Sequence, residues 1–522
     1  MKKSLSIISC LLLVSGIAGC SKQQEVSTAA SSLLHACPGF VETGKPPLVS
    51  GAQCGRLMVK ENPADPASKD IDIEILRLPA ISPAAQQDPL FLIQGGPGGS
   101  SIEMANFIHG FFADVRKNRD LIFVDQRGTG KSNPLRCEQL NEADLQLPES
   151  AQMEKYFHFK ELCSEKFKTS LPFYTTLPAV QDLDAVRQAL GYKAINLWGV
   201  SYGTRVALEY AKRYPQSTRS ITLDGVAPKE IALSRFSARD SLAALTVVNG
   251  ECQLQPECAR EFGDILQKTE TVYARLQLAD QSGSSLIINY EHPVYQQPEH
   301  LTLTAKSFSM LIFNALYSRD LTVLLPQAIS EAERENYRLL AALFSLAMEQ
   351  SQKMNIADAM HFSVLCNEDW HFISASDVET TPPFFGLNAI KDRNKICSFW
   401  PKANLPDDFW QPIHSEVPAL LLSGKHDPVT PESWAELVAS GLPNSVRLLA
   451  AGGNHGVSYE GCVPQIIAQF IERGTMSDVK TDCVANIKPL PLVLGANQKK
   501  TSSSSAASSA VSDGVTGEGV KP

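Results

Sequence analysis

The sequence predicts an α/β domain in which a mostly parallel sheet is flanked by helices and interrupted by an inserted helical cap. Short apolar runs recur along the chain, and buried strands of this kind are typical of a parallel sheet covered on both faces. Helical periodicity lies between these runs, as expected of a doubly wound fold. From about residue 228 to 404 helical periodicity dominates, so we expect this insertion to cover the carboxyl edge of the sheet.

The predicted elements follow one another from the N-terminus. Residues 70–78 alternate between apolar and polar side chains, which indicates a half-buried strand, and residues 55–60 could pair with it. The apolar runs that predict buried strands are residues 89–94, 121–125, 194–199, 220–224, 418–422 and 446–450. The predicted helices are residues 180–190, 204–214, 307–317, 332–349 and 464–473.

Composition divides the chain into six segments. The expected boundaries are a signal peptide at 1–19, a flexible tether at 20–36, the first part of the core at 37–228, the cap at 229–404, the second part of the core at 405–496, and a disordered tail at 497–522.

The first twenty residues are typical of a targeting signal. Two lysines precede a short apolar stretch, and the Ile-Ala-Gly-Cys that ends at Cys20 resembles the bacterial lipobox, in which lipid is attached to the cysteine after cleavage. We therefore expect a lipid anchor on Cys20 and a location in the cell envelope. Because Ser21 is not an aspartate, we expect the outer membrane of a Gram-negative cell, on its periplasmic face. The alternative is an ordinary signal peptide with an incidental cysteine.

Composition also excludes several classes of function. Lys and Arg number 47 against 56 Asp and Glu, so the net charge is −9, and nucleic acid is not an expected partner. Long apolar runs are confined to the N-terminus, which excludes a polytopic membrane protein.

Cysteine usage agrees with export. Of 12 cysteines, Cys10 leaves with the signal and Cys20 is assigned to lipid, so an even number remains and disulfides are expected. Pairing neighbours would give five short loops, but the sequence leaves the connectivity open. The remaining cysteines are Cys37, Cys54, Cys137, Cys163, Cys252, Cys258, Cys366, Cys397, Cys462 and Cys483. Their spacing lacks paired Cys-x-x-Cys knuckles, so no metal is expected.

The stretch Gly199-Val200-Ser201-Tyr202-Gly203 follows a predicted strand and precedes a predicted helix. A nucleophile turn requires this context, because the sharp turn exposes the serine at the strand tip. The helix N-terminus behind the turn favours developing negative charge. We therefore predict Ser201 as a catalytic nucleophile, with a plain serine in a tight turn as the alternative.

A serine hydroxyl needs a base, and the base needs an orienting acid. On such sheets the chain order is Ser, acid, His. Asp427 follows one predicted strand and His455 follows the next, so we predict His455 as the general base and Asp427 as the acid that orients it. Asp224 is the alternative acid. His426 competes as base, but it adjoins the acid.

Residues 94–100 (Gln-Gly-Gly-Pro-Gly-Gly-Ser) come at the end of an apolar strand. Acyl transfer creates an oxyanion that backbone N–H groups can stabilise. We predict that the N–H groups of Gly96 and Tyr202 form this oxyanion hole, the alternative being a glycine turn without a chemical role.

Residues 128–132 (Gly-Thr-Gly-Lys-Ser) are similar to the end of a phosphate-binding loop. That motif needs a glycine where this sequence has Asp125, so nucleotide is not expected. We expect no cofactor.

Residues 125–132, which begin Asp-Gln-Arg-Gly, and the Gly-Gly-Pro-Gly-Gly at 95–99 resemble the prolyl aminopeptidase and tripeptidyl aminopeptidase group of α/β-hydrolases. The resemblance covers about residues 37–494, and the long cap and the region 462–494 are similar to the tripeptidyl branch. The family's oxyanion loop opens with a histidine, where this sequence has Gln94. The resemblance implies an α/β-hydrolase fold and a serine peptidase that removes one or a few residues from peptide N-termini.

The resemblance also implies acidic cap residues that bind the substrate's ammonium group, since a partly desolvated ammonium needs a carboxylate partner. The candidates are Glu368 and Asp369, with Glu103 after the oxyanion loop, although each could be an ordinary structural carboxylate. Asp125 and Arg127 are expected to stabilise the loops below the site.

Three functions are compared on these grounds. A lipid-anchored serine exopeptidase acting on short peptides is the expected one. The same triad could serve an esterase, a lactonase or another small-molecule acyl hydrolase. A non-catalytic binding protein on this fold usually lacks a triad member, and none is missing here.

Overall fold

The computed structural model describes residues 33–37, 51–141, 144, 149–284, 286–353, 355–380 and 387–494. The predicted signal peptide, Cys20, most of the tether and the tail lie outside the described residues. Strand β1 (Leu34–Ala36) falls within the range expected to be tether, so the sheet begins earlier than the sequence predicted. In the described part of the chain, no helix combines the length and apolarity needed to cross a bilayer.

A nine-stranded sheet forms the core, in the order β1-β2-β3-β5-β4-β6-β7-β10-β11. The first three strands are antiparallel, and β3 pairs antiparallel with β5, whereas the strands from β5 to β11 in this order are parallel. The bounds are β2 (Gln53–Lys60), β3 (Asp70–Leu78), β4 (Leu90–Ile93), β5 (Leu121–Val124), β6 (Ile195–Val200), β7 (Thr218–Asp224), β10 (Ala419–Gly424) and β11 (Ser445–Ala450). The predicted strands and the N-terminal hairpin are confirmed.

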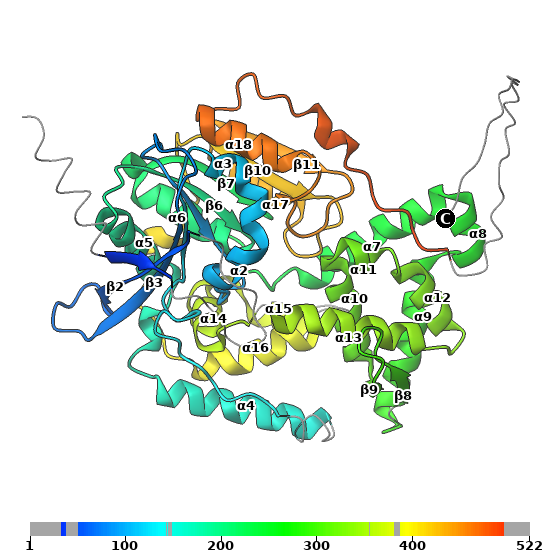
Figure 1. The fold of residues 1–522 in the computed structure, drawn as a ribbon. Helices are drawn as coiled ribbons and strands as arrows, with labels where there is room; N and C mark the ends of the chain where they lie inside the picture. Colours follow the sequence, from blue (N-terminus) through cyan, green and yellow to red (C-terminus); the bar gives the residue numbers. More distant parts are fainter. Residues whose placement is uncertain are drawn as a thin grey trace, which may run out of the picture.

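Helices cover both faces of this sheet, as predicted (Figure 1). Side chains alternate along the strands: Phe91 and Leu421 pack under one helical layer, and Leu92 and Leu420 under the other. The first layer contains α5 (Thr176–Ala189), α6 (Tyr202–Arg213) and α17 (Glu432–Ala439), and the second contains α2 (Ser101–Ile108), α3 (Ala113–Arg116) and α18 (Val463–Arg473). Short helical turns are η1 (His109–Phe112), η3 (Leu171–Phe173), η4 (Pro215–Ser217), η7 (Asp407–Trp410) and η8 (Asp482–Asn486).

The insertion between β7 and β10 has two parts. The first has its own apolar core and comprises α7 (Ser237–Leu254), α8 (Pro256–Phe262), α9 (Ile265–Gln281), β8 (Leu286–Glu291), β9 (Pro298–Leu303), α10 (Ala305–Tyr317), α11 (Arg319–Thr322), α12 (Leu325–Glu333) and α13 (Arg338–Lys353). The second packs against the core of the sheet and comprises α14 (Asp358–Val364), a π-helical turn η5 (Leu365–Asp369), η6 (Trp370–Phe372), α15 (Ala375–Thr380) and α16 (Leu387–Phe399).

The hairpin β8–β9 and helix α4 are among the elements that the sequence did not predict. The insertion contains the antiparallel hairpin β8–β9, whose strands are short; β8 alternates between half-buried and exposed residues. Helix α4 (Glu149–Lys166), between β5 and α5, packs against α16, and its apolar residues show little helical periodicity.

Each of the ten cysteines after Cys20 is paired with its neighbour. The disulfides are Cys37–Cys54, Cys137–Cys163, Cys252–Cys258, Cys366–Cys397 and Cys462–Cys483. The neighbour pairing considered from the sequence is therefore confirmed.

The described C-terminal residues tie the core to the cap (Figure 1). The backbone N–H of Gly452, after β11, donates to the carbonyl of Ile487 (2.8 Å), and the N–H of Val493 donates to the carbonyl of Val323 in the cap (3.1 Å). Between these contacts Leu492 is buried in the apolar core of the cap.

Arg127 holds the first half of the core together. Its guanidinium forms a two-pronged ion pair with Asp182 of α5, at 2.7 Å for each hydrogen bond. It also donates to the carbonyls of Glu61 (2.6 Å) and Phe173 (3.1 Å). Arg127 is fully buried and far along the chain from these partners, in keeping with the structural role expected for it.

Replacing Arg127 by methionine should lower the free energy of unfolding by about 3–5 kcal/mol, because the substitution leaves the buried Asp182 carboxylate without its partner. Chemical denaturation followed by fluorescence measures this loss. Arg447→Met is the control: Arg447 pairs with Glu436 at 2.7 Å but is 37% exposed, so a change of about 1 kcal/mol or less is expected. Equal losses in the two variants would contradict the prediction.

Candidate active site

Ser201 lies in a strained turn between β6 and α6. Its φ of 57° and ψ of −127° are unusual for a residue with a side chain, as the nucleophile turn requires. Its N–H donates to the carbonyl of Asp224 (2.8 Å). A Cβ added at Gly199 would lie 2.3 Å from the carbonyl oxygen of Gly203, and one added at Gly203 would lie 2.3 Å from that of Ile93. Only glycine therefore allows these segments to approach so closely.

Asp427 and His455 follow β10 and β11, and the structure brings them into contact. Nδ1 of His455 lies 2.9 Å from Oδ2 of Asp427. The N–H groups of Val429 and Thr430 donate to Oδ1 of Asp427, at 2.8 Å each, and the Thr430 hydroxyl donates to Oδ2 at 2.7 Å. The carboxylate is therefore fixed, and Nε2 is the imidazole nitrogen left for the reacting proton.

The role of Thr430 was not predicted from the sequence. An aspartate that accepts hydrogen bonds from the backbone two and three residues later forms a common turn, so the pattern Asp427-Pro428-Val429-Thr430 was the available signal.

The charges of the acid and the base support one another. Burial disfavours a charged Asp427, but the attraction of His455 and the hydrogen bonds of His455 and Thr430 hold the pKa of Asp427 below its ordinary value. Burial also disfavours a charged His455, yet the charge and hydrogen bond of Asp427, with a contribution from Asp224, raise the pKa of His455. The pair is thus suited to stabilise the imidazolium formed when His455 accepts a proton.

Asp224, the alternative acid, and His426, the alternative base, make other contacts. The buried carboxylate of Asp224 accepts hydrogen bonds from the N–H groups of Val457 (2.9 Å) and Ser458 (2.7 Å), so it anchors the loop after His455. Nε2 of His426 lies 2.9 Å from a carboxylate oxygen of Glu251 in the cap helix α7.

The glycine loop after β4 packs directly against the nucleophile turn. A Cβ added at Gly95 would lie 2.8 Å from Cβ of Ser201 and 3.3 Å from the backbone nitrogen of Tyr202. The Gly95 N–H donates to Oε1 of Gln94 (2.9 Å), and the Gly99 N–H donates to the carbonyl of Gly95 (3.0 Å). Gln94 therefore supports the loop with its own side chain.

These contacts leave Gly96 and Tyr202 as the candidate oxyanion donors. Gly96 has a φ of +119°, which favours glycine, and it precedes a cis peptide bond to Pro97. Tyr202 begins α6, and the first N–H groups of a helix have no partner within the helix.

The second part of the insertion holds the far side of this loop. The N–H of Ala357 donates to the carbonyl of Gly98 (3.0 Å), and Nδ1 of His361 lies 3.0 Å from the carbonyl oxygen of Pro97. On the core side Asp125 accepts hydrogen bonds from the Ser100 hydroxyl (2.6 Å), and burial raises the pKa of Asp125 to about 6. His361 was missed because nothing local in the sequence links it to the loop.

Glu368 and Asp369 lie in the π-helical turn, and both are almost fully buried. The carboxylate of Glu368 accepts hydrogen bonds from the N–H (2.7 Å) and hydroxyl (2.8 Å) of Thr176, and burial raises the pKa of Glu368 to about 7. Asp369 accepts from Arg205 (2.7 Å) and from the N–H of Leu233 (3.0 Å). Because both side chains are almost fully buried and are held by internal partners, the structure gives them a structural role, and the expectation that they bind the ammonium group is corrected.

Glu103 differs from these two. It is exposed in the first turn of α2, directly after the oxyanion loop, and Nδ2 of Asn355 lies 3.2 Å from each of its carboxylate oxygens. It therefore remains a candidate for contact with substrate.

The cap also contacts the loop that carries the base. Nδ2 of Asn454 donates to the carbonyl of Leu316 (2.7 Å) and to the hydroxyl of Thr322 (2.9 Å). The ring of Tyr317 packs edge-on against the ring of His455, with 5.0 Å between their centroids. Contacts from helices α10 and α11 thus position the loop that carries His455.

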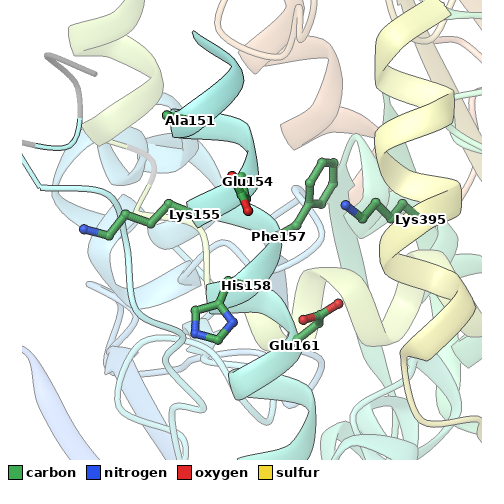
Figure 2. A pocket seen from close by; sticks show the side chains of 7 residues that line it. All are labelled: Ala151, Glu154, Lys155, Phe157, His158, Glu161 and Lys395. Atoms are coloured by element: carbon green, nitrogen blue, oxygen red, sulfur yellow. The ribbon is translucent and has the colours of Figure 1, made fainter. Parts of the chain in front are cut away.

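Figure 2 shows a surface groove that lies elsewhere. The groove is lined by Ala151, Glu154, Lys155, Phe157, His158 and Glu161 of α4 and by Lys395 of α16. None of these residues belongs to the predicted triad or oxyanion hole, so this groove is not assigned to the reaction.

Comparisons with known proteins agree with the arrangement of the two core parts. A family described as alpha/beta hydrolase fold matches residues 88–252, which include Gly96, Ser201 and Tyr202. A family described as TAP-like protein matches residues 382–483, which include Asp427 and His455.

Among curated relatives, the serine protease Hip1 of Mycobacterium tuberculosis is 25% identical over 83% of this chain and 87% of that protein. The tripeptidyl aminopeptidase of Streptomyces lividans is 31% identical over 33% of this chain and 35% of that protein. The proline iminopeptidase of Neisseria gonorrhoeae is 25% identical over 42% of this chain and 51% of that protein. The chain thus has the α/β-hydrolase fold, and its homologues are serine proteases and aminopeptidases.

In Ser201→Ala protein, the pKa of His455 should lie above its ordinary value of 6.5, because the Asp427 carboxylate stabilises the protonated ring. Adding Asp427→Asn should lower this pKa. Titration of the histidine ring signals by NMR measures both values, with histidines far from the site as the internal control. Since a general base must be neutral, kcat/KM should decline as the pH drops through this pKa. A pKa of His455 that is the same with and without the carboxylate would refute the assignment.

Proposed function

We propose that this serine hydrolase of the α/β-hydrolase fold is an exopeptidase that removes one or a few residues from peptide N-termini. The observation that carries the proposal is the Asp427–His455 hydrogen bond at the same sheet edge as the strained turn of Ser201. The relatives support a peptide as the substrate, since they include a serine protease and two enzymes that act at peptide N-termini by name.

Each step of the proposed reaction is assigned to one of these groups. Ser201 Oγ attacks the carbonyl carbon of the scissile bond while Nε2 of His455 accepts its proton. The N–H groups of Gly96 and Tyr202 donate to the resulting oxyanion. His455 then gives the proton to the departing amine, and water repeats the sequence on the acyl-enzyme to release the N-terminal fragment.

The free N-terminus of the substrate needs a carboxylate partner near the site. Because Glu368 and Asp369 are engaged internally, we assign this contact to Glu103, which is exposed directly after the oxyanion loop. In the described structure, the only hydrogen-bond partner of the Glu103 carboxylate is the side chain of Asn355, a neutral amide that an ammonium group could displace.

We also propose that the protein is attached to the membrane of the cell envelope through lipid on Cys20, with the outer membrane as the site in a Gram-negative cell. The support is the order of lysines, short apolar stretch and Ile-Ala-Gly-Cys at the N-terminus. The five disulfides are consistent with an oxidising compartment.

The purified enzyme should release chromophore from unblocked peptide amides and should be labelled by a fluorophosphonate probe. Ser201→Ala should abolish both, because no other nucleophile occupies the turn. Comparison with simple esters of similar size separates a peptidase from an esterase or lactonase. Equal turnover by the alanine variant, or turnover of esters alone, would overturn the exopeptidase proposal.

Acetylating the substrate's N-terminus should reduce kcat/KM by at least about tenfold, since it removes the ammonium that a carboxylate would bind. Glu103→Gln is the matched control: it lacks the carboxylate assigned to this contact, so acetylation should reduce its kcat/KM by a smaller factor. Equal rates for free and acetylated peptides would argue against an N-terminal exopeptidase.

Cys20→Ser should abolish incorporation of a labelled fatty acid and release the protein from the membrane fraction. Cys10→Ser, within the predicted signal peptide, is the matched control and should label as the unaltered protein does. Labelling of the Cys20→Ser protein at the level of the control would refute the lipid anchor.

A further inference from the structure

His426 lies directly before the acid, and its side chain crosses from the core to the cap. The side chain is 3% exposed, and its Nε2 lies 2.9 Å from Oε2 of Glu251 on α7. The other carboxylate oxygen of Glu251 lies 3.9 Å from Nζ of Lys425, one residue earlier on the same loop. The proposed reaction makes no use of this buried imidazole, so its contact with the cap calls for another function.

The backbone of His426 is joined to the loop that carries the base. Its N–H donates to the carbonyl of Gly453 (2.9 Å), and the N–H of Lys425 donates to the carbonyl of Ala450 at the end of β11 (3.1 Å). Gly453 lies two residues before His455. His426 therefore links three parts of the site: the cap through its side chain, the loop of the base through its N–H, and the acid through its peptide bond.

The cap packs closely on this loop. A cavity of about 10 Å³ lies where α7 and α11 meet the loops of the acid and the base, and it is lined by His426, Glu251, Thr322 and Asn454 among others. A cavity of this size holds about one water molecule, so little space separates the two sides. Helix α7 contacts the loop a second time at Pro428, whose carbonyl accepts from the Ser241 hydroxyl (3.4 Å). One cap helix thus contacts the residues on both sides of the acid.

The proton of the His426 ring is located by these contacts. A carboxylate can only accept, so Nε2 carries the hydrogen and donates it to Glu251. Nδ1 of His426 is buried and has no hydrogen-bond partner among the described residues, so a proton there would be buried without an acceptor. The bond to the cap is therefore the hydrogen bond that fixes the direction of this ring.

The residue directly before the base shows the same arrangement. Asn454 precedes His455, and its side chain also donates to the cap, at the carbonyl of Leu316 (2.7 Å) and the hydroxyl of Thr322 (2.9 Å). The residues before the acid and before the base are thus each held by the cap through a side chain. The distance between the two loops then depends on the cap as well as on the sheet.

We propose that His426 is a positioning residue for Asp427 and that Glu251 of the cap acts through it. The contact holds the acid within hydrogen-bond distance of His455. The inference rests on the proposed function, because it takes Asp427 and His455 as the acid and the base. A displacement of about 1 Å is enough to reduce the rate of catalysis strongly, so losing the contact lowers the rate although neither residue touches the substrate.

Two substitutions of Glu251 separate the hydrogen bond from the charge. Glu251→Ala removes both, whereas Glu251→Gln removes the charge and keeps an oxygen that can accept from Nε2 of His426. The matched control is Glu333→Ala in α12, which removes a carboxylate that pairs with Lys268 inside the cap at 3.6 Å. Each variant is assayed over a range of pH with unblocked peptide amides and with 4-nitrophenyl esters.

Glu251→Ala should lower kcat by about tenfold or more while KM stays within about threefold of its original value. The acid limb of the kcat/KM profile should move to lower pH, because a loosened Asp427 raises the pKa of His455 less. Glu251→Gln should lower kcat by less than about threefold, and Glu333→Ala should leave kcat and the pH profile as in the unaltered enzyme.

His426 tests the same contact from the core side. His426→Gln keeps an N–H donor near the position of Nε2 and should lose less activity than His426→Leu, which fills the space without donating. The double variant Glu251→Ala/His426→Leu should be no slower than the slower of its two parents, because both substitutions remove one bond. If Glu251→Ala does not fold, the comparison of the leucine and glutamine variants decides the question.

Equal losses in Glu251→Gln and Glu251→Ala would overturn the proposal, because they indicate an effect of charge alone. A lower Tm with an unmoved acid limb would also overturn it, since that result indicates a purely structural contact. If esters are turned over and peptides are not, the exopeptidase function fails while the same variants still test His426. If neither substrate is turned over, NMR titration decides: the pKa of His455 should be lower in Glu251→Ala than in Glu251→Gln, and equal values would refute the positioning role.

Discussion

The candidate site depends on close backbone packing at the carboxyl ends of the parallel strands. Glycine permits this packing at β6, where Gly199 and Gly203 bring the nucleophile turn against β4. It recurs at β10, where a Cβ on Gly424 would lie 2.1 Å from the carbonyl oxygen of Asn454. Because no side chains separate their backbones, the nucleophile turn lies against β4, and Gly424 at the end of β10 lies against the loop that carries His455. Loss of any of these contacts would move a reacting group, and a displacement of about 1 Å is enough to reduce the rate of catalysis strongly.

The insertion covers the candidate site and also makes contacts that hold its loops. It holds the oxyanion loop through Ala357 and His361 and the loop of the base through contacts with Asn454. Ser241 of α7 also contacts the carbonyl of Pro428, next to the acid. Together with the C-terminal residues that join the core to the cap, these contacts favour a substrate route built by fixed elements over one opened by a swinging lid.

The sequence predicted the features that arise from local pattern. Apolar runs located the parallel strands, and the context of Ser201 and the chain order of Asp427 and His455 located residues that the structure brings to one edge. The environment of Glu368 was not predictable, because its carboxylate is hydrogen-bonded by Thr176, which lies far away in the sequence.

The interrupted sheet has a consequence for biosynthesis. The strand that presents Ser201 is followed by β7 and the entire insertion, and only then by β10 and β11, which carry the acid and the base. On the proposed assignment, a growing chain contains its nucleophile long before the residues that activate it. A product terminated within the insertion would lack both partners and be inert. Because the acid and the base are synthesised last, hydrolysis cannot start until the polypeptide is complete, and no activating cleavage is needed for this delay.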